Sequence, residues 1–348
     1  MVSRIYITAT VALIGLIVPG AGAASAQGPP AAAAPYKYVT VALPGKLNTG
    51  VADINDSGAY VGEGCDEMDG MFTNCRQFIA SPQGKLSFYT IPTDWSATSY
   101  LPVGIDDRGD VDGQYTDSQG ATHGYLRRVD ADGTITWTKI DDPLAADVNG
   151  GGTTPESISA DGSVIVGGYA DYVDGNLVPH GFFYNTTTGK FTTYDVPVPG
   201  ASTGINFYYD GEFGGGYTSS TGIGYAFYVK DGQFHTVQAP GLPNLPNGEG
   251  PTLTAVSADG TLFGYELSQD PIFGFAYANG KYTTIKDPHE VATTNTEAVN
   301  GDGTEAVNAN LEGTVVGDYT YTPGTSSQPG YVHGYIAMPE REGVAGSQ

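Results

Sequence analysis

Three histidines stand before a glycine in one recurring phrase, and they are the first candidates for chemistry. The phrase is His-Gly followed by an aromatic residue, and it begins at His123, His180 and His333. An imidazole can act as a general base or as a metal ligand near neutral pH. The alternative is a repeat-signature histidine that bonds backbone within its own turn, and we expect that structural role for all three.

A fourth histidine lies outside this phrase, next to an acid. His289 and Glu290 adjoin in the long segment 289–305. Loops carried by a rigid scaffold are where binding and catalytic residues concentrate. His289 and Glu290 are therefore the better candidates for a ligand-binding pair.

Acidic residues gather beside glycine in several short stretches. One of them is residues 65–70, which contains Asp66, Glu67 and Asp69. Oxygen-rich flexible loops suit Ca²⁺, so these three residues form a candidate calcium site. None of the stretches has the spacing of a twelve-residue calcium loop, and Asp and Asn also serve as ordinary turn formers. The sequence therefore requires no cofactor, and Ca²⁺ is the one it could use.

Aromatic residues in predicted loops are candidates for sugar contacts. Trp95 follows Asp94, and a Trp that stacks on a sugar beside a carboxylate that bonds its hydroxyls is a common arrangement. Tyr100, Tyr172 and Tyr331 occupy similar loop positions. A single exposed Trp can equally be a packing residue.

Signatures of catalysis are absent from the sequence. There is no GxSxG, HExxH, phosphate-binding loop or dinucleotide glycine motif. Glycoside hydrolysis needs only two carboxylates at a set distance, and a chain with 38 acidic residues could supply them. A binding module is favoured, with a polysaccharide hydrolase or lyase as the alternative.

A repeat organises the chain and must position these residues. A turn, a short apolar strand and a glycine recur in the stretches 55–64, 106–115, 159–169, 208–217, 257–265 and 310–319. Each is followed by the His-Gly phrase or its variant, and in the first five units a strand that ends in proline comes next; one further strand of this kind precedes the first unit. These prolines are Pro44, Pro92, Pro143, Pro197, Pro240 and Pro288. A unit of about four strands with this period is typical of a propeller blade.

The first proline-ended strand has no unit before it, whereas the last unit lacks such a strand. We therefore predict an all-β, six-bladed β-propeller over residues 36–339, in which the strand before Pro44 completes the last blade. Residues 38–43 should pair with residues 331–337. A straight solenoid is the alternative, although it would require capping repeats.

This topology separates two faces of the ring. The short-turn face carries the turns such as 55–58, and the long-loop face carries the loops between the second and third strands and between blades. We place any binding site on the long-loop face at the mouth of the central channel. Its predicted loops are 66–74, 93–100, 144–155, 170–179, 241–251, 289–305 and 321–331.

The His-Gly-aromatic phrase, beside stretches such as 159–169, resembles the HAF repeats of bacterial extracellular proteins. The resemblance covers about residues 36–339. The first, fourth and fifth units depart from it, since Arg76-Gln77, Ile223-Gly224 and Ile272-Phe273 stand near the histidine position. The resemblance implies a propeller fold and an extracellular location, and it transfers no catalytic residue.

The net charge and the cysteines limit which binding partners and which cellular compartment the sequence is compatible with. The net charge is −24, which opposes binding to nucleic acid or anionic membrane. Cys65 and Cys75 are the only cysteines, and in an exported protein they are expected to form a disulfide. No stretch of the mature chain has the length and apolar character of a membrane span.

These features predict a secreted or periplasmic monomer that binds an extracellular carbohydrate, a surface polymer or another protein. A purely structural repeat protein is a third class. Residues 27–35 should form a flexible lead, and residues 340–348 a polar tail.

Residues 1–26 have the organisation of a signal peptide, with Arg4, an apolar run and Ala24-Ser25-Ala26 at the end. Amino-terminal sequencing of the exported protein should find a first residue near Gln27. Exported material that retains residues 1–26 would contradict this prediction.

Overall fold

The computed structural model describes residues 36–68, 71–237, 251–266, 272–291, 303–322 and 331–340. The predicted signal peptide 1–26, the lead 27–35 and all of the tail beyond residue 340 lie outside these ranges, and so do parts of the loops 241–251, 289–305 and 321–331. Among the described residues no helix has the length and apolar character needed to cross a bilayer.

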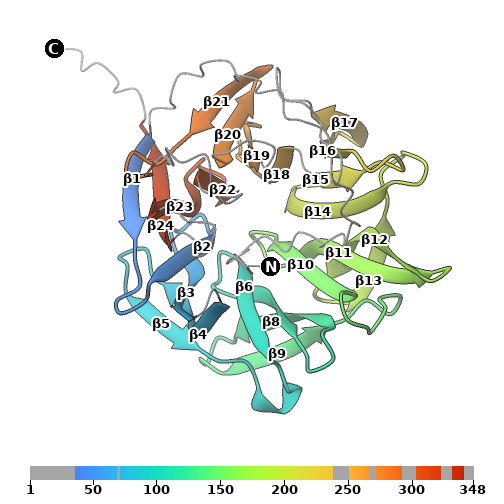
Figure 1. Cartoon of the computed structure of the whole chain (residues 1–348), viewed down its shortest axis with the longest axis horizontal. Coiled ribbons are helices and arrows are strands. Elements are labelled where there is room, and N and C mark those ends of the chain that lie inside the picture. Colours follow the sequence, from blue (N-terminus) through green and yellow to red (C-terminus); the bar gives the residue numbers. More distant parts are fainter. Residues whose placement is uncertain are drawn as a thin grey trace.

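The described residues form 24 strands and one short 3₁₀ turn, so the fold is all-β. Apart from β1, the strands follow one another in antiparallel groups around a common axis (Figure 1). The first group contains β2 (Asn48–Ile54), β3 (Tyr60–Met68), β4 (Met71–Ala80) and β5 (Leu86–Tyr89). The second group follows η1 (Thr93–Trp95) and contains β6 (Ser99–Ile105), β7 (Val111–Thr116), β8 (Thr122–Val129) and β9 (Ile135–Ile140).

The remaining groups repeat this order. The third contains β10 (Gly152–Ile158), β11 (Val164–Val173), β12 (Asn176–Asn185) and β13 (Lys190–Tyr194). The fourth contains β14 (Ser202–Tyr209), β15 (Glu212–Thr218), β16 (Gly224–Lys230) and β17 (Gln233–Val237). The fifth contains β18 (Pro251–Val256), β19 (Leu262–Glu266), β20 (Ile272–Ala278) and β21 (Lys281–Ile285), and the sixth β22 (Gly303–Ala309), β23 (Val315–Thr322) and β24 (Tyr331–Pro339).

The opening strand β1 (Tyr36–Val41) pairs with β24 as an antiparallel neighbour. Tyr38 lies opposite Ala337, and Val41 lies opposite Gly334. Of the predicted pairing of residues 38–43 with 331–337, the part between residues 38–41 and 334–337 is therefore confirmed. Figure 1 shows the blue first strand beside the red last one.

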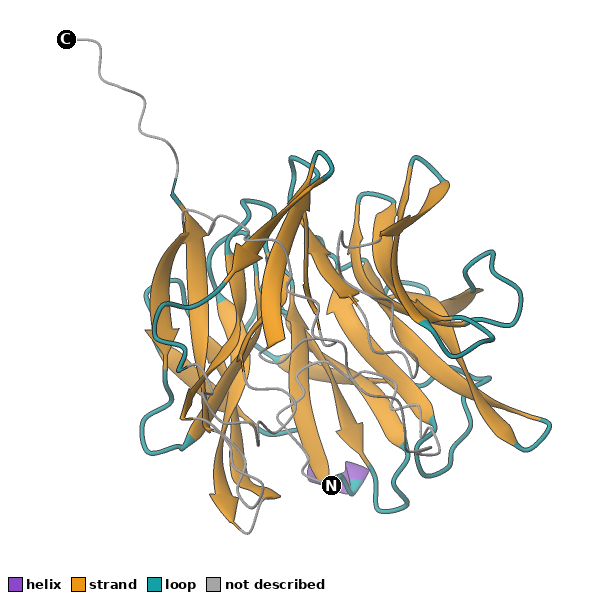
Figure 2. Ribbon diagram, turned by 45° about the horizontal axis from the view of Figure 1, so that its top comes forward, coloured by secondary structure: helices purple, strands orange, loops and turns teal. Residues whose placement is uncertain are grey.

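The innermost strand of each group is its first strand in the chain, namely β2, β6, β10, β14, β18 or β22. Each contacts the innermost strand of the next group in chain order, and β22 contacts β2. Hydrogen bonds also link the turn after β22 to the turn after β2. Asn310 Nδ2 donates to Asn55 O at 3.2 Å, and Leu311 N donates to Asp56 Oδ1 at 2.9 Å. Figure 2 shows the groups in a tilted view, with turns and loops gathered at the ends of the strands.

A β-bulge interrupts each innermost strand, and it explains the second glycine of the repeat. The bulge lies between Val51 and Asp53 in β2. It brings the carbonyl of Gly50 so close to Gly62 that an added Cβ would lie 2.1 Å from that oxygen. The same approach occurs at Gly264 and Gly317. Glycine is therefore required by the carbonyl of the paired strand.

Two predicted long loops are instead extended hairpins. Residues 66–74 are largely within β3 and β4, and residues 170–179 are largely within β11 and β12. The ladder continues through Tyr172 opposite Leu177 and turns at Asp174-Gly175, where both residues have positive φ. The prediction of loops at these two places was wrong because strand pairing satisfies the backbone polar groups that a loop would expose.

Tyr335 joins the sixth group to β1, since its buried ring lies 5.8 Å from that of Tyr38 and its hydroxyl donates to Glu305 O at 2.9 Å. We expect Tyr335→Ala to lower the free energy of unfolding by about 3–5 kcal/mol, as for other large buried aromatics. Val39→Ala, at a position 42% exposed on β1, is the control and should cost much less. Equal midpoints of urea unfolding for the two variants would contradict this assignment.

Candidate functional site

The third strand of each group lies against the next group, and one position there decides how close the two groups come. The residue at this position is Gln77, Gly124, Gly181, Ala226, Gly274 or Gly334, in order from the first group. An added Cβ would lie 2.5 Å from Pro155 at Gly124 and 2.8 Å from Ile205 at Gly181. Only the first group places a long side chain at this contact.

Gln77 changes the junction between the first and second groups. Its side chain is buried, and Nε2 donates to Tyr100 O at 2.8 Å and to Glu63 Oε2 at 3.3 Å. Because Gln77 takes up space where the other groups have glycine or alanine, the strands around it leave a cleft. The cleft has a volume of about 240 Å³ and lies on the long-loop face, between the ends of β4, β5 and β6.

The cleft is lined by residues from both groups. These are Cys75, Arg76, Gln77, Phe88, Tyr89, Thr90 and Tyr100. None of these lining residues is acidic. Aromatic rings, one guanidinium and one amide therefore make up most of the chemistry of its wall.

Arg76 supplies the positive charge at the cleft. Its Cζ lies 3.8 Å from the centre of the Phe88 ring, which is a cation–π arrangement. Among the described residues Arg76 has no ion-pair partner, and its side chain is exposed. The planar guanidinium offers several donors in a fixed geometry, so it can bind oxygen atoms of a ligand that enters the cleft.

Glu63 lies buried beneath Gln77. Burial raises the pKa of its carboxyl to about 7, and the hydrogen bond from Gln77 only partly opposes this shift. Burial likewise raises the pKa of the Tyr89 phenol, whose hydroxyl lies 2.9 Å from that of Tyr125. The floor of the cleft is therefore a set of fixed hydrogen-bonding groups with little free charge.

Cys65 and Cys75 form the predicted disulfide. It links β3 to the middle of β4, directly before Arg76. A covalent link across the two strands restrains the backbone at the cleft wall. The disulfide is thus part of the scaffold that positions Arg76.

Of the residues predicted to bind a ligand, only Tyr100 lines this cleft. Trp95 is half-buried and packs 5.2 Å from Tyr115, with Lys139 Nζ 5.3 Å from its ring centre, while Asp94 beside it is exposed. Trp95 therefore belongs largely to an aromatic cluster of the second group. Tyr172 is 58% exposed on the β11 hairpin.

The other predicted ligand residues lie in the fifth and sixth groups. Glu290 accepts from Thr304 Oγ1 at 2.6 Å and pairs with Lys286 at 2.8 Å. His289 is exposed, and its Nδ1 lies 2.9 Å from Asp287 Oδ1. Tyr331 stacks 6.2 Å from Tyr321. These residues are therefore not gathered around Tyr100.

The repeat-signature histidines contact carboxylates or rings, and among the described residues their imidazoles have no hydrogen bond to the backbone. Nδ1 of His123 lies 2.8 Å from Asp141 Oδ1, and Nδ1 of His180 lies 2.9 Å from Asp195 Oδ1. His333 instead stacks on Tyr321 at 3.8 Å, and burial lowers its pKa. For His123 and His180 the neighbouring fourth strand offers an aspartate two residues before its proline.

The candidate calcium residues do not form a loop. Asp66 and Glu67 are neighbours on β3, so their side chains leave opposite faces of the strand. Asp66 already accepts from Lys46 at 3.0 Å and from Asn74 at 2.7 Å. Asp69 lies outside the described residues.

An axial pocket opens on the short-turn face, opposite to the predicted channel mouth. It is lined by the ends of all six innermost strands, including Asp53, Asn55, Asp107 and Asn310, and has a volume of about 60 Å³. A second cavity below it, lined by Glu156, Asn206 and residues of the other innermost strands, holds only about 20 Å³. Both volumes are large enough for water molecules and smaller than that of the cleft beside Gln77.

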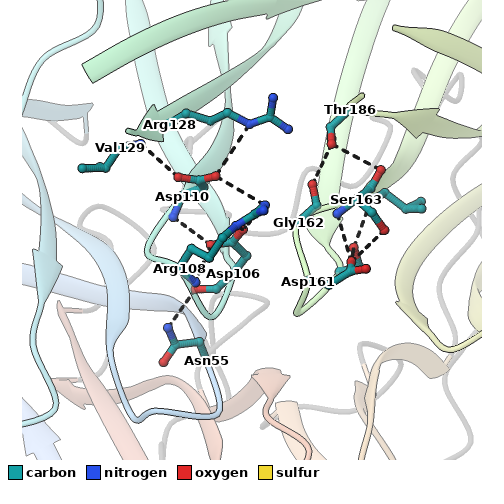
Figure 3. A network of polar contacts seen from close by, with 12 residues as sticks. Asn55, Asp106, Arg108, Asp110, Arg128, Val129, Asp161, Gly162, Ser163 and Thr186 are labelled. Carbon is teal, nitrogen blue, oxygen red and sulfur yellow. Dashed lines mark hydrogen bonds and ion pairs between the residues drawn. The ribbon is translucent and has the colours of Figure 1, made fainter. Parts of the chain in front are cut away.

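The carboxylates around the short-turn face are held by arginines. Arg108 pairs with the buried Asp106 at 2.9 Å and with Asp110 at 3.5 Å, and Arg128 lies 3.6 Å from Asp110 (Figure 3). Asn55 of the first group donates to Asp106 O at 2.8 Å. This network joins neighbouring groups and leaves these carboxylates engaged in structure.

No family model and no curated protein matches this sequence. Among solved structures it is similar to TolB from Acinetobacter baumannii, with 11% identity, a TM-score of 0.45 and coverage of 68% of this chain and 52% of that one. The chain thus spans about half the length of the TolB chain. An Aleuria aurantia lectin in complex with Fucα1-6GlcNAc has 10% identity and a TM-score of 0.45 over 89% of this chain and 98% of the lectin. The β-propeller domain of the Trilobed protease from Pyrococcus furiosus has 10% identity and a TM-score of 0.42 over 83% of this chain and 95% of that one.

The raised pKa of Glu63 predicts a pH-dependent stability. The folded chain keeps the Glu63 proton up to about pH 7, whereas the unfolded chain releases it near the ordinary value of 4.5. Stability should therefore fall as pH rises from about 4.5 to about 7 and then level off. Glu63→Gln should be more stable than the native chain at pH 8, by up to about 3 kcal/mol.

Urea unfolding at several pH values measures this difference. The two proteins should have equal stability below pH 4.5, and Asp94→Asn, at an exposed position, should follow the native curve. Parallel curves for Glu63→Gln and the native chain would show that Glu63 does not hold its proton.

Proposed function

We propose that this protein is a secreted or periplasmic six-bladed β-propeller, closed by β1 in the last blade, that binds an extracellular carbohydrate. We include it among the HAF-type repeat proteins because the His-Gly phrase recurs at the same place in several groups. The pairing of β1 with β24 and the contact of β22 with β2 support the ring. The disulfide supports an oxidising compartment outside the cytoplasm.

The single observation that carries the binding function is the cleft opened by Gln77. It occurs at the one junction where the repeat departs from a small residue, and it faces the side of the ring on which loops are long. A repeat that served only as a scaffold would gain nothing from this departure. The cleft also joins two groups, and such junctions are frequent places for ligand pockets.

The lining of the cleft suits a carbohydrate. The rings of Phe88, Tyr89 and Tyr100 offer apolar faces for the C–H side of a sugar. Arg76 and Gln77 offer planar donors for its oxygens. The exposed position of Arg76 and Thr90 at the entrance leaves room for a chain that continues beyond one sugar unit.

The same lining favours binding over hydrolysis. Hydrolysis of a glycosidic bond uses two carboxyl groups, about 5–9.5 Å apart, on either side of the bond. No carboxylate lines the cleft, and Glu63 is buried behind Gln77. The proposal is therefore a binding module without turnover at this site.

A glycan array probed with the mature chain, followed by calorimetry on the best hit, tests this function. Arg76→Ala should weaken binding about 10–100-fold, because a hydrogen bond from a charged group contributes about 1.5–3 kcal/mol. Gln77→Gly should also weaken it. Tyr172→Ala, which removes an exposed ring in another group, should leave affinity unchanged.

An array without hits would overturn the carbohydrate assignment. Binding that is unchanged in Arg76→Ala and Gln77→Gly would place the ligand elsewhere on the ring. Release of shortened sugars from the hit would overturn the conclusion that the protein only binds.

A further inference from the structure

Three metal-binding side chains converge where the second group meets the third, away from the cleft. They are Asp117 at the end of β7, His123 on β8 and Asp147 in the connection from β9 to β10. One ligand atom from each lies within 4.8 Å of the other two. Nε2 of His123 lies 3.7 Å from Asp117 Oδ2.

The carboxylate of Asp117 is held in place by its own turn. Its Oδ1 accepts from Gln119 N at 2.7 Å and from Ala121 N at 3.0 Å. Its Oδ2 is the oxygen nearest to His123 Nε2. The turn thus leaves one oxygen of Asp117 for a ligand.

The connection that carries Asp147 is fastened to the same turn. Gly150 N donates to Gly120 O at 3.2 Å, and Thr122 N donates to Gly151 O at 3.0 Å. These bonds lie on the carboxyl-terminal side of Asp147 and anchor its segment beside β8. Asp147 itself is exposed, so it can bind an ion without leaving a buried position.

The ring of His123 is oriented from the opposite side. Its Nδ1 lies 2.8 Å from Asp141 Oδ1, and its plane stacks on Tyr115 with 4.8 Å between ring centres. A carboxylate on Nδ1 fixes the proton there and leaves Nε2 with its lone pair. Nε2 faces Asp117 Oδ2 at 3.7 Å, and a carboxylate oxygen of Asp147 completes a set of three ligand atoms that lie within 4.8 Å of one another.

We propose that Asp117, His123 and Asp147 bind a divalent transition-metal ion of the Zn²⁺ class, with Asp141 as the outer partner of the histidine. A cation removes the mutual repulsion of the three acceptors. Imidazole together with carboxylate oxygens is a donor set that suits Zn²⁺ better than Ca²⁺, which prefers oxygen ligands alone. Three protein ligands leave a coordination position open to water or to a ligand atom.

The third group provides an internal comparison. His180 has the same bond from Nδ1 to a carboxylate, that of Asp195, and its ring stacks on Tyr169 at 5.1 Å. In the described part of the chain His180 belongs to no set of three converging ligand atoms. The other such set, Glu63 with Cys65 and Cys75, has both sulfurs in the disulfide. The histidine–aspartate pair is therefore a feature of the repeat, and Asp147 is what distinguishes the second group.

Calorimetry with ZnCl₂ on the untagged mature chain, after treatment with a chelator and dialysis, tests the proposal. The native chain should bind one Zn²⁺, and Asp147→Asn and His123→Ala should each lose this binding. Asp141→Asn should keep the stoichiometry but weaken binding about 10–100-fold, as expected for a partner outside the coordination shell. His180→Ala is the matched control and should bind as the native chain does.

Asp147→Asn changes an exposed residue, so its circular dichroism should equal that of the native chain and loss of binding cannot be ascribed to unfolding. A native chain that binds no Zn²⁺ overturns the proposal. So does binding that persists in Asp147→Asn and His123→Ala, or that is lost equally in His180→Ala.

Discussion

The close approach of neighbouring groups at their third strands governs the rest of this structure. Where Gly124 or Gly181 stands, the next innermost strand comes so near that even a methyl group would collide. This packing brings the innermost strands into contact around the axis, and the axial cavities lined by described residues are small. Gln77 relaxes the same constraint at one junction, and the cleft that carries the proposed binding function opens beside it.

The residue directly before Gln77, or before the glycine or alanine at the same place in the other groups, differs chemically from group to group while the backbone stays the same. This position is occupied, in order from the first group, by Arg76, His123, His180, Tyr225, Phe273 and His333. In the second and third groups the histidine meets an aspartate of the fourth strand, at Asp141 and Asp195. In the first group the arginine has no such partner among the described residues and stands over Phe88. The same position in the repeat therefore places an exposed guanidinium in the first group and an imidazole that contacts an aspartate in the second and third groups.

Several acidic residues are buried on the innermost strands, and this has a physical consequence. Burial raises the pKa of Asp53 to about 7, and burial with the nearby Asp112 raises that of Glu156 well above its ordinary value. An ionised carboxylate without a counter-ion is costly to bury. These groups therefore hold protons or accept backbone bonds, as Asp53 does from Ile54 and Ile105, both at 2.8 Å.

The sequence by itself determined the local structure of this protein. Turn glycines, the alternation of strands and the prolines after each fourth strand predicted the groups, the disulfide and the place of β1, because each depends on residues close in sequence or on one missing strand. Only the tertiary structure decided the site. The repeat showed that Gln77 differed, but the resulting cleft depends on how near β6 comes, and the partners of His123 come from two connections, β7 to β8 and β9 to β10. Contacts between segments so far apart follow from packing around the axis, which no local pattern encodes.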